Sequence, residues 1–578
     1  MVKKTMLFGL GAFAAALVAS CSFFDFETPV DSTLPPDKEI AIDGNTPVSK
    51  IDFSDVSGSV SISIDSLTNK SVYLVKYAAA SAAAGQTGSA VANEYSAQPS
   101  AASPERSAAS GVFTAGDGSA SVRYDHLAAQ RFNRSPPPES GGGVRAAAEE
   151  ARAAYKVYTE DGLTGQFWVE AGSSGNSWIR ESAVLRAASE HAAVWVADKN
   201  FTQTESASND NKITQAQAEE IAVRFDAIYQ KETPIFGYEY GGGPGGDGGR
   251  DGDPKIQILV YDIDGDYKRN QTSGVFGYFW AKDFYTQAEA GKTKSNAAEI
   301  FYLDAHFADK HPDGAISTLA HEFQHMINFN EKSVKSDFKQ SSETWFDEML
   351  AMLAEDLIDP LVGVVESEFP YNQRIPLFLN GYSDCAPTTW MEGEKALYSY
   401  ANSYAFGAYL IRNFGGARLV KEMMTNSKVN EESVVDAVNA MSPAAAPATA
   451  ERGGGWNFSD LLSRYGEALI FSGNEKPSGV FSFDNTVTEI IDGTEYTCAG
   501  FDIWGMDNPF AGKKLSSQYS MVYPSKGPLI IDTGYAIGMF ENTFIVQSNA
   551  AWRNKTGNVT MRLNKPASSA VAFFIMIK

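Results

Sequence analysis

The stretch TLAHEFQHMINF, from Thr318 to Phe329, constrains this chain most, because it places two histidines four residues apart with a glutamate beside the first. On an α-helix, His321 and His325 project from one face about one turn apart, close enough to bind a single tetrahedral zinc ion. Glu322 can then reach a water on that metal and take its proton as a general base, without being a ligand. The spacing therefore predicts a helix that carries a zinc site.

The apolar residues around the two histidines fall on one helical face, as an amphipathic helix requires. They are Ile316, Leu319, Ala320, Phe323, Met326 and Ile327. Asp313 or Ser317 can cap the N-terminus of this helix. An ordinary core helix has the same periodicity, so the zinc site depends on a further ligand.

The third ligand must be a cysteine, aspartate or glutamate if it lies downstream, because no histidine follows His325. The next segment, SSETWFDEMLAMLAEDL, has the apolar spacing and the residue types of a second helix. It contains Glu343 and Glu348 at usable distances from the first helix. Spacing alone leaves both glutamates open as ligands.

The sequence WFDEMLAMLAED resembles the Trp-Leu-Asn-Glu-Gly-Phe-Ala helix of gluzincin metallopeptidases, in which the glutamate of the Asn-Glu pair completes a two-histidine, one-glutamate site. The resemblance implies Glu348 as the third ligand, with Glu343 as the alternative. It also implies that Glu355 lies on the same side as a hydrogen-bonding partner of a ligand histidine. Asp347 stands where that family has asparagine, which departs from the pattern.

The segments VYDI, GYFW and IFYLDA, followed by TLAHEFQHMINF and the WFDE helix, are together similar to the hyicolysin family of secreted bacterial zinc metallopeptidases over roughly residues 190–425. This resemblance implies a zincin-type domain, one catalytic Zn²⁺ and hydrolysis of peptide bonds in a protein or peptide substrate. Related aminopeptidases carry a Gly-x-Met-Glu-Asn segment before the zinc helix. This sequence has no such segment before its zinc helix, so an endopeptidase is favoured.

An oxyanion donor is also expected in such a hydrolase. In aminopeptidase-type gluzincins, a tyrosine followed three residues later by glycine has this role, and NSYAFGAYLIRNFGG offers Tyr404 and Gly407. The resemblance thus implies Tyr404 as a catalytic residue, with Tyr400 or Tyr398 as alternatives. Core packing of all three aromatic rings is the competing interpretation.

The N-terminal sequence MVKKTMLFGLGAFAAALVASC has two lysines, a short apolar run and small residues before Cys21, the pattern of a secretory signal. Val18 to Cys21 resemble a bacterial lipobox, which implies lipidation of Cys21. We therefore expect a lipid-anchored protein of the bacterial cell envelope. Ser22 is not the aspartate that marks inner-membrane retention, so the outer membrane or cell surface is favoured.

The formal net charge of -24 repels nucleic acid and anionic lipid headgroups, and no basic tract offsets it. Nucleic acid is therefore excluded as a partner, and membrane attachment is expected through the N-terminal lipid alone. A surface adhesin or host-factor-binding lipoprotein, with an inactive or secondary peptidase domain, is the alternative function. The intact Glu322 counts against it, because a decayed peptidase can lose this base.

The expected fold class is multidomain α+β, with a zincin-type metallopeptidase domain flanked by a β-rich N-terminal segment and a C-terminal β-sandwich. The predicted parts are a signal peptide (1–20), a tether (21–50), a β-rich segment (51–77), a low-complexity Ala/Ser/Gly/Pro linker (78–145), a β-rich region or pro-region (146–200), the zinc metallopeptidase domain (201–472) and the β-sandwich (473–578).

The glycine-rich loop GYEYGGGPGGDGGRDGDP precedes its strand and lacks the ending of a P-loop, so it does not predict nucleotide binding. Asp247, Asp251 or Asp253 of this loop could bind calcium, and a solvated turn is the alternative interpretation. A disulfide between Cys385 and Cys498 is equally open.

Overall fold

A computed structural model describes residues 35–79, 122–123, 126–136, 164–172, 177–204, 211–269, 271–285, 293–392, 395–441, 455–473, 476–515, 521–533, 539–566, 568 and 570–578. The chain divides into two compact units. Unit 1 comprises Met1–Glu105, Ser516–Met521 and Ile530–Lys578, and unit 2 comprises Arg106–Leu515 and Val522–Leu529. The predicted signal peptide and Cys21 lie outside the described residues.

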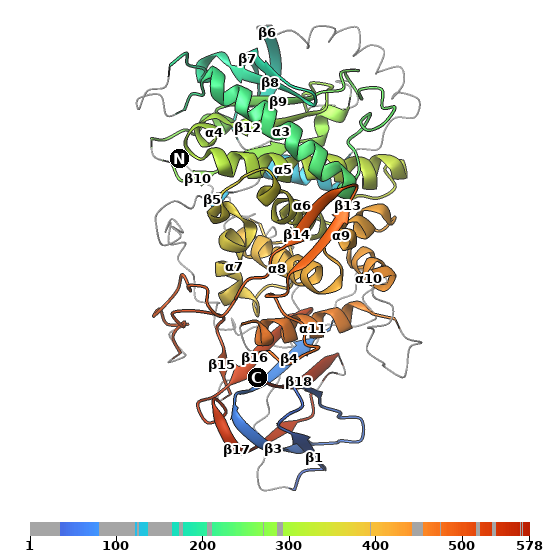
Figure 1. The fold of residues 1–578 in the computed structure, drawn as a ribbon, viewed down its shortest axis with the longest axis vertical. Helices are drawn as coiled ribbons and strands as arrows, with labels where there is room; N and C mark the ends of the chain where they lie inside the picture. The colour runs from blue at the N-terminus through green and yellow to red at the C-terminus, as the bar shows by residue number, and fades with distance from the viewer. Residues whose placement is uncertain are drawn as a thin grey trace, which may run out of the picture. The chain divides into compact units, whose positions relative to one another are not determined.

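Unit 1 is built from strands near both ends of the sequence, coloured blue and red in Figure 1. One sheet has the order β1 (Lys38–Asp43), β3 (Ser59–Lys70), β17 (Lys555–Asn564). The other has the order β15 (Ile531–Asp532), β16 (Thr543–Ser548), β4 (Val72–Ala78), β18 (Val571–Ile577), β2 (Val48–Lys50).

Both sheets of unit 1 contribute to one hydrophobic core. In β3, Val60, Ile62 and Ile64 alternate with less buried residues, so one face of the strand enters this core. Residues 51–77 and the C-terminal strands are therefore parts of one unit, whereas the sequence predicts two separate regions. Residues 473–515, predicted to begin the C-terminal sandwich, belong to unit 2.

Unit 2 contains a mixed sheet in which six strands are described. Its order is β11 (Gly277–Phe279), β12 (Ile300–Asp304), β9 (Ile256–Tyr261), β8 (Ala192–Ala197), β7 (Trp178–Ala188), β6 (Thr164–Glu170). β8, β9 and β12 are parallel and fully buried, as their unbroken apolar runs indicate. Strands β6 and β7 pair directly with this sheet, so residues 164–188 belong to its fold.

One face of this sheet is covered by α3 (Gln215–Phe236), which packs on β7 and β8, and by α5 (Pro312–Asn328), which packs on β11 and β12 (Figure 1). α4 (Ala305–Lys310) links β12 to α5. A capping box between Thr214 and Gln217 begins α3, and Gly237, with φ of 104°, ends it. The helix α5 thus lies beside the edge strand β11.

Further helices of unit 2 follow α5. They are α6 (Thr344–Ile358), α7 (Pro370–Gly381), α8 (Ala396–Phe414), α9 (Gly416–Thr425), α10 (Glu431–Met441) and α11 (Phe458–Phe471). α6 packs against both α5 and α8, which brings the two predicted metal-site helices into contact.

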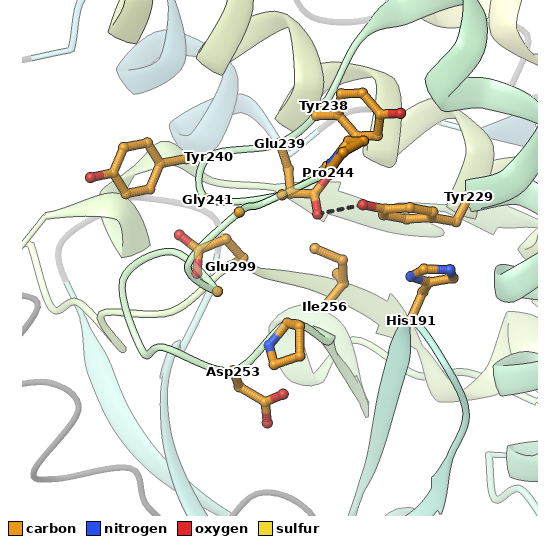
Figure 2. A pocket seen from close by; sticks show the side chains of 15 residues that line it. His191, Tyr229, Tyr238, Glu239, Tyr240, Gly241, Pro244, Asp253, Ile256 and Glu299 are labelled. Atoms are coloured by element: carbon orange, nitrogen blue, oxygen red, sulfur yellow. Dashed lines mark hydrogen bonds between the residues drawn. The ribbon is translucent and has the colours of Figure 1, made fainter.

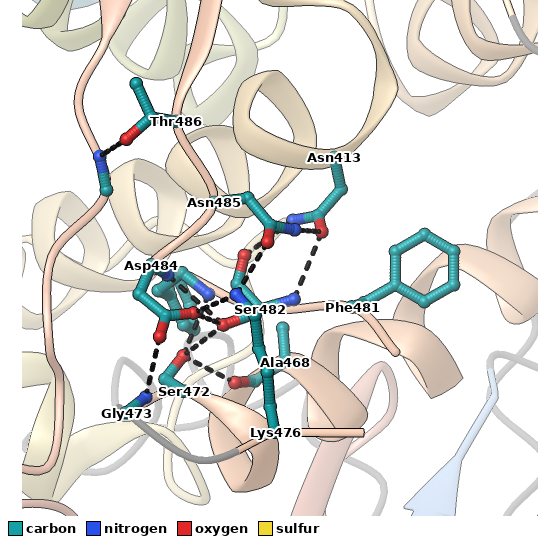
Figure 3. A network of polar contacts seen from close by, with 12 residues as sticks. Asn413, Ala468, Ser472, Gly473, Lys476, Phe481, Ser482, Asp484, Asn485 and Thr486 are labelled. Atoms are coloured by element: carbon teal, nitrogen blue, oxygen red, sulfur yellow. Dashed lines mark hydrogen bonds and ion pairs between the residues drawn. The ribbon is translucent and has the colours of Figure 1, made fainter. Parts of the chain in front are cut away.

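A polar network fixes the segment after α11 to the helices of unit 2 (Figure 3). Asn413 of α8 accepts from the backbone N–H of Ser482 and from the side chain of Asn485. Asp484 accepts from the backbone N–H of Gly473, just beyond α11. The hairpin of β13 (Val487–Ile491) and β14 (Thr494–Cys498) follows and packs on α9. These contacts explain why residues 473–515 belong to the helical unit.

Two stretches of the predicted low-complexity linker lie among the described residues and have regular secondary structure. Residues 122–123 form β5 (Val122–Arg123), which pairs in parallel with β10 (Ser273–Gly274). Residues 127–134 form α1 (Leu127–Arg134), capped by His126. The prediction of a linker over 78–145 is wrong for these residues, because α1 lies within unit 2 and buries Ala129 in its core.

None of the helices in the described ranges is both long and apolar enough to cross a bilayer. Cys385 and Cys498 are both buried free thiols, so the disulfide considered for them is not formed.

Candidate metal centre

The helix α5 presents His321, Glu322 and His325 on the side that meets α6. Pro312 occupies the first turn of α5, where a missing N–H removes no helical hydrogen bond. The two imidazole ring centroids are 4.7 Å apart, as the spacing of four residues on a helix predicts. His321 is only 6% exposed.

Glu348 of α6 completes a three-residue cluster with the two histidines. Its Oε2 lies 3.3 Å from His321 Nε2 and 3.5 Å from His325 Nε2. All three donor atoms lie within 4.8 Å of one another. Ligand atoms at ~2.0–2.1 Å from a tetrahedral zinc ion are roughly 3.3 Å apart. Glu348 Oε2 is buried and faces both Nε2 atoms at 3.3 and 3.5 Å, so the donor set fits a metal ion.

Carboxylates behind the cluster orient both imidazoles. His321 Nδ1 lies 2.7 Å from Glu355 Oε1, and His325 Nδ1 lies 3.1 Å from Asp347 Oδ1. These contacts turn the Nε2 atom of each ring toward Glu348. The sequence predicts Glu355 as a hydrogen-bonding partner of a ligand histidine, but it does not predict this role for Asp347. The place of Asp347, next to Glu348 on the same helix, could have indicated it.

The cluster is electrostatically suited to a cation. Burial disfavours the charged form of His321, but its hydrogen bonds to Glu348 and Glu355 raise its pKa to about 10. Burial opposes ionisation of Glu348 too, yet His325 and His321 hold its pKa well below the usual range. Without a metal, protons on the imidazoles therefore supply the positive charge that the carboxylates require.

Glu322 lies beside the cluster and, together with His325 and Glu348, lines a narrow cleft. Its Oε2 accepts a hydrogen bond of 2.7 Å from the backbone N–H of Phe279, on the edge strand β11. This contact fixes the carboxylate relative to both the metal ligands and the sheet edge. Burial raises the pKa of Glu322, which favours proton uptake at this position.

The cleft at the metal centre is narrow, with a cavity volume of about 30 Å³. Glu322, His325 and Glu348 line one side of it, and Gln130 and Asn133 of α1 line another. The sequence gives no indication that α1 reaches the site, because α1 lies within an Ala/Ser/Gly/Pro-biased segment.

Glu343, the alternative ligand, is not part of the cluster found among the described residues. It stands at the N-terminus of α6, and its Oε2 accepts a hydrogen bond of 2.8 Å from the indole of Trp345. The geometry therefore favours Glu348.

Tyr404 is fully buried in α8, and its hydroxyl donates to Asp356 Oδ2 at 3.0 Å. Arg412 makes a bidentate pair with the same carboxylate. Tyr404 does not line the cleft, so its role as oxyanion donor stays a prediction that this packing does not favour. Tyr400 packs against Trp390, and Tyr398 lies against Gly381.

The aspartates considered for calcium cap their own turns. Asp247, Asp251 and Asp253 each accept from the backbone N–H two residues later. Within the described residues, the metal cluster of histidine, cysteine and carboxylate side chains is the one at His321, and it includes none of these aspartates. The calcium site stays a prediction without geometric support.

A second and larger cavity, of about 280 Å³, lies at the glycine-rich loop and shares no lining residue with the cleft at the metal centre. Figure 2 shows the hydroxyl of Tyr229 directed at Glu239, to which it donates at 3.0 Å. His191 stacks on the Tyr229 ring with centroids 3.8 Å apart. Burial raises the pKa of Glu239 to about 7.

The residues of the metal centre lie within a part of the chain that is similar to known proteins. Residues 186–463 match the family model described as Peptidase M30. The chain is 31% identical over 269 residues to the neutral metalloprotease ShpI of Staphylococcus hyicus. The matched residues make up 45% of this chain and 54% of that protein. The chain thus spans about half the length of the curated relative that it matches. Both similarities support a metalloprotease.

Proposed function

We propose that the region matching Peptidase M30 is a zinc endopeptidase that hydrolyses peptide bonds in protein or peptide substrates. The observation that carries this proposal is the convergence of His321 Nε2, His325 Nε2 and Glu348 Oε2 within 4.8 Å, with Glu322 beside them. Two imidazole nitrogens and one carboxylate oxygen are the donor set of hydrolytic zinc sites that keep one coordination position open.

His321, His325 and Glu348 would hold the ion, oriented by Glu355 and Asp347. When bound, zinc supplies Lewis acidity, which polarises a peptide carbonyl and makes water more acidic. Glu322 is anchored through Oε2 by the Phe279 N–H. Its other oxygen, Oε1, takes a proton from the attacking water and returns it to the leaving amine.

We further propose that the protein acts outside the cytoplasm and is attached to the cell envelope by a lipid on Cys21. The signal-like sequence and the lipobox resemblance before Cys21 support this location. The outer membrane or the cell surface is favoured by Ser22. The absence of an amino-terminus-binding Gly-x-Met-Glu-Asn segment before α5 supports cleavage within chains.

The test compares the wild-type protein with Glu322→Gln for zinc content and casein cleavage. We expect both proteins to bind one zinc ion, and the variant to lose activity by about 10²- to 10⁴-fold. Glu422→Gln, at an exposed position of α9, is the matched control and keeps full activity. Zinc binding with no cleavage that depends on Glu322 would instead support the binding-protein alternative.

A further inference from the structure

The helix α1 lies against the residues that form the metal centre. Gln130 Nε2 donates to Glu348 Oε1 at 2.8 Å, and Gln130 Oε1 accepts from the indole N–H of Trp390 at 3.2 Å. Because an indole N–H can only donate, the Gln130 oxygen faces Trp390 and its nitrogen faces the carboxylate. The side chain of Gln130 is therefore fixed at both ends, directly on a predicted metal ligand.

Asn133, one helical turn later, occupies the exposed edge of the sheet. Its Nδ2 donates to the carbonyl oxygen of Phe279 at 2.9 Å, and its Oδ1 accepts from the N–H of Ala281 at 2.7 Å. Among the described strands β11 is the terminal one of this sheet, so no described strand pairs with the outer side of Phe279 and the residues that follow it. A single side-chain amide thus takes the donor and the acceptor that an extended peptide would use at a sheet edge.

Further contacts hold α1 in the cleft along its length. The His126 ring packs against both Tyr278 and Trp280, with centroid distances of 4.3 and 5.1 Å. Arg131 pairs with Glu392 at 3.0 Å. Each of these contacts is noncovalent, and the side chains of both Arg131 and Glu392 are exposed. The helix is therefore held by the buried His126 ring, by the apolar packing of Ala129 and Phe132, and by several polar contacts.

The space left beside α1 is too small for a substrate. The cavity volume of about 30 Å³ accommodates on the order of one or two water molecules. A peptide approaching Glu322 from β11 would meet Asn133 at the strand edge and Gln130 at Glu348. Substrate and α1 therefore compete for the same groups.

From these contacts we infer that α1 is an autoinhibitory segment that occupies the substrate cleft and must leave before a polypeptide binds. The inference rests on the proposed peptidase function, because it treats this cleft as the substrate site. If α1 were instead a permanent wall of the cleft, loosening it would not open the site.

The first test uses Asn133→Ala, which removes the contacts with the Phe279 carbonyl and the Ala281 N–H without touching a proposed metal ligand. Asn372→Ala is the matched control, because Asn372 also donates to a backbone carbonyl, that of Glu366, outside the cleft. Zinc content, hydrogen exchange of the Ala281 amide and calorimetric binding of a dipeptide hydroxamate are measured on the full-length protein.

We expect Asn133→Ala to keep its zinc, to exchange the Ala281 amide at least about tenfold faster, and to bind the hydroxamate about 5- to 50-fold more tightly, since two hydrogen bonds are lost. Exchange and binding unchanged relative to Asn372→Ala, or weaker hydroxamate binding, would overturn the inference. Cleavage is assayed separately, so faster exchange and tighter binding without any cleavage would refute the peptidase function and not the position of α1.

The second test uses charge reversal at the exposed pair. Arg131→Glu should raise hydroxamate affinity about two- to fivefold, the range expected for an exposed ion pair. The double variant Arg131→Glu/Glu392→Arg should restore the wild-type affinity. A gain that the second substitution does not reverse would contradict the assignment, because it would not arise from this contact.

Discussion

Asp347 Oδ1 lies 3.1 Å from His325 Nδ1, so the residue immediately before Glu348, the proposed third ligand, orients His325, another proposed ligand. One turn of α6 therefore supplies both a ligand and the partner of another ligand. We expect Asp347→Ala to lower zinc affinity by about 10- to 100-fold. Competition with a chromophoric chelator measures this, and Asp347→Asn, which keeps an acceptor oxygen, should lose less. Equal affinities for all three proteins would contradict this role.

The choice of third ligand can be tested directly. Glu348→Ala should remove stoichiometric zinc, because its Oε2 lies within 3.5 Å of both Nε2 atoms. Glu343→Ala should retain zinc, because that carboxylate binds the Trp345 indole instead. Elemental analysis after dialysis distinguishes the two, and loss of zinc in Glu343→Ala alone would reverse the assignment.

Metal removal should destabilise the protein. A ligand that binds only the folded state at about 100 times its Kd adds about 2.7 kcal/mol to the free energy of unfolding. We therefore expect zinc to raise the melting temperature of the wild type, and a strong chelator to reverse the increase. His325→Ala should show no increase, whereas His191→Ala, at the second cavity, should respond as the wild type does.

Tyr404 gives a prediction that separates packing from catalysis. Its hydroxyl is buried and donates to Asp356, so Tyr404→Phe should lower the free energy of unfolding by about 1 kcal/mol and leave kcat within a fewfold of wild type. An oxyanion donor would instead reduce kcat by about 10²- to 10³-fold. Denaturant unfolding and peptide kinetics on the same preparation decide between the two.

Glu239 predicts a pH dependence of stability. Burial raises its pKa in the folded state to about 7 from 4.5, so between these values the folded protein binds more protons than the unfolded chain. The free energy of unfolding should therefore fall as pH rises from about 4.5 to 7, by up to about 3 kcal/mol. Glu239→Gln should lack this decrease and be more stable than wild type above pH 7. Denaturant titrations at several pH values test this, with Glu422→Gln as the exposed control.

The metal-site helices could be predicted from sequence because their information is local. The spacing of His321 and His325 and the apolar periodicity around them specify a helix and one face of it. The same reasoning finds the buried strands β9 and β12.

Long-range relationships could not be predicted in this way. Nothing in the residues of β3 specifies β17 as its partner. The alternation of apolar and polar residues shows which face of a strand is buried, but not which strand pairs with it. The helix α1 was missed for a similar reason. Gln130 and Asn133 acquire meaning only from Glu348 and Phe279, which lie far away in sequence. Average composition describes such a segment as unable to fold by itself, which does not exclude folding against a partner.

The pairing of β3 with β17 makes the completion of synthesis a condition for folding unit 1. Roughly 480 residues separate Lys70 from Lys555, and at about 5–20 residues per second a ribosome needs about 25–100 s to make them. During that time the edges of β3 and β4 lack the partners that β17 and β18 will supply. The N-terminal strands must therefore be kept from aggregating until the last strands arrive, and a product truncated before β17 is left with unpaired strand edges.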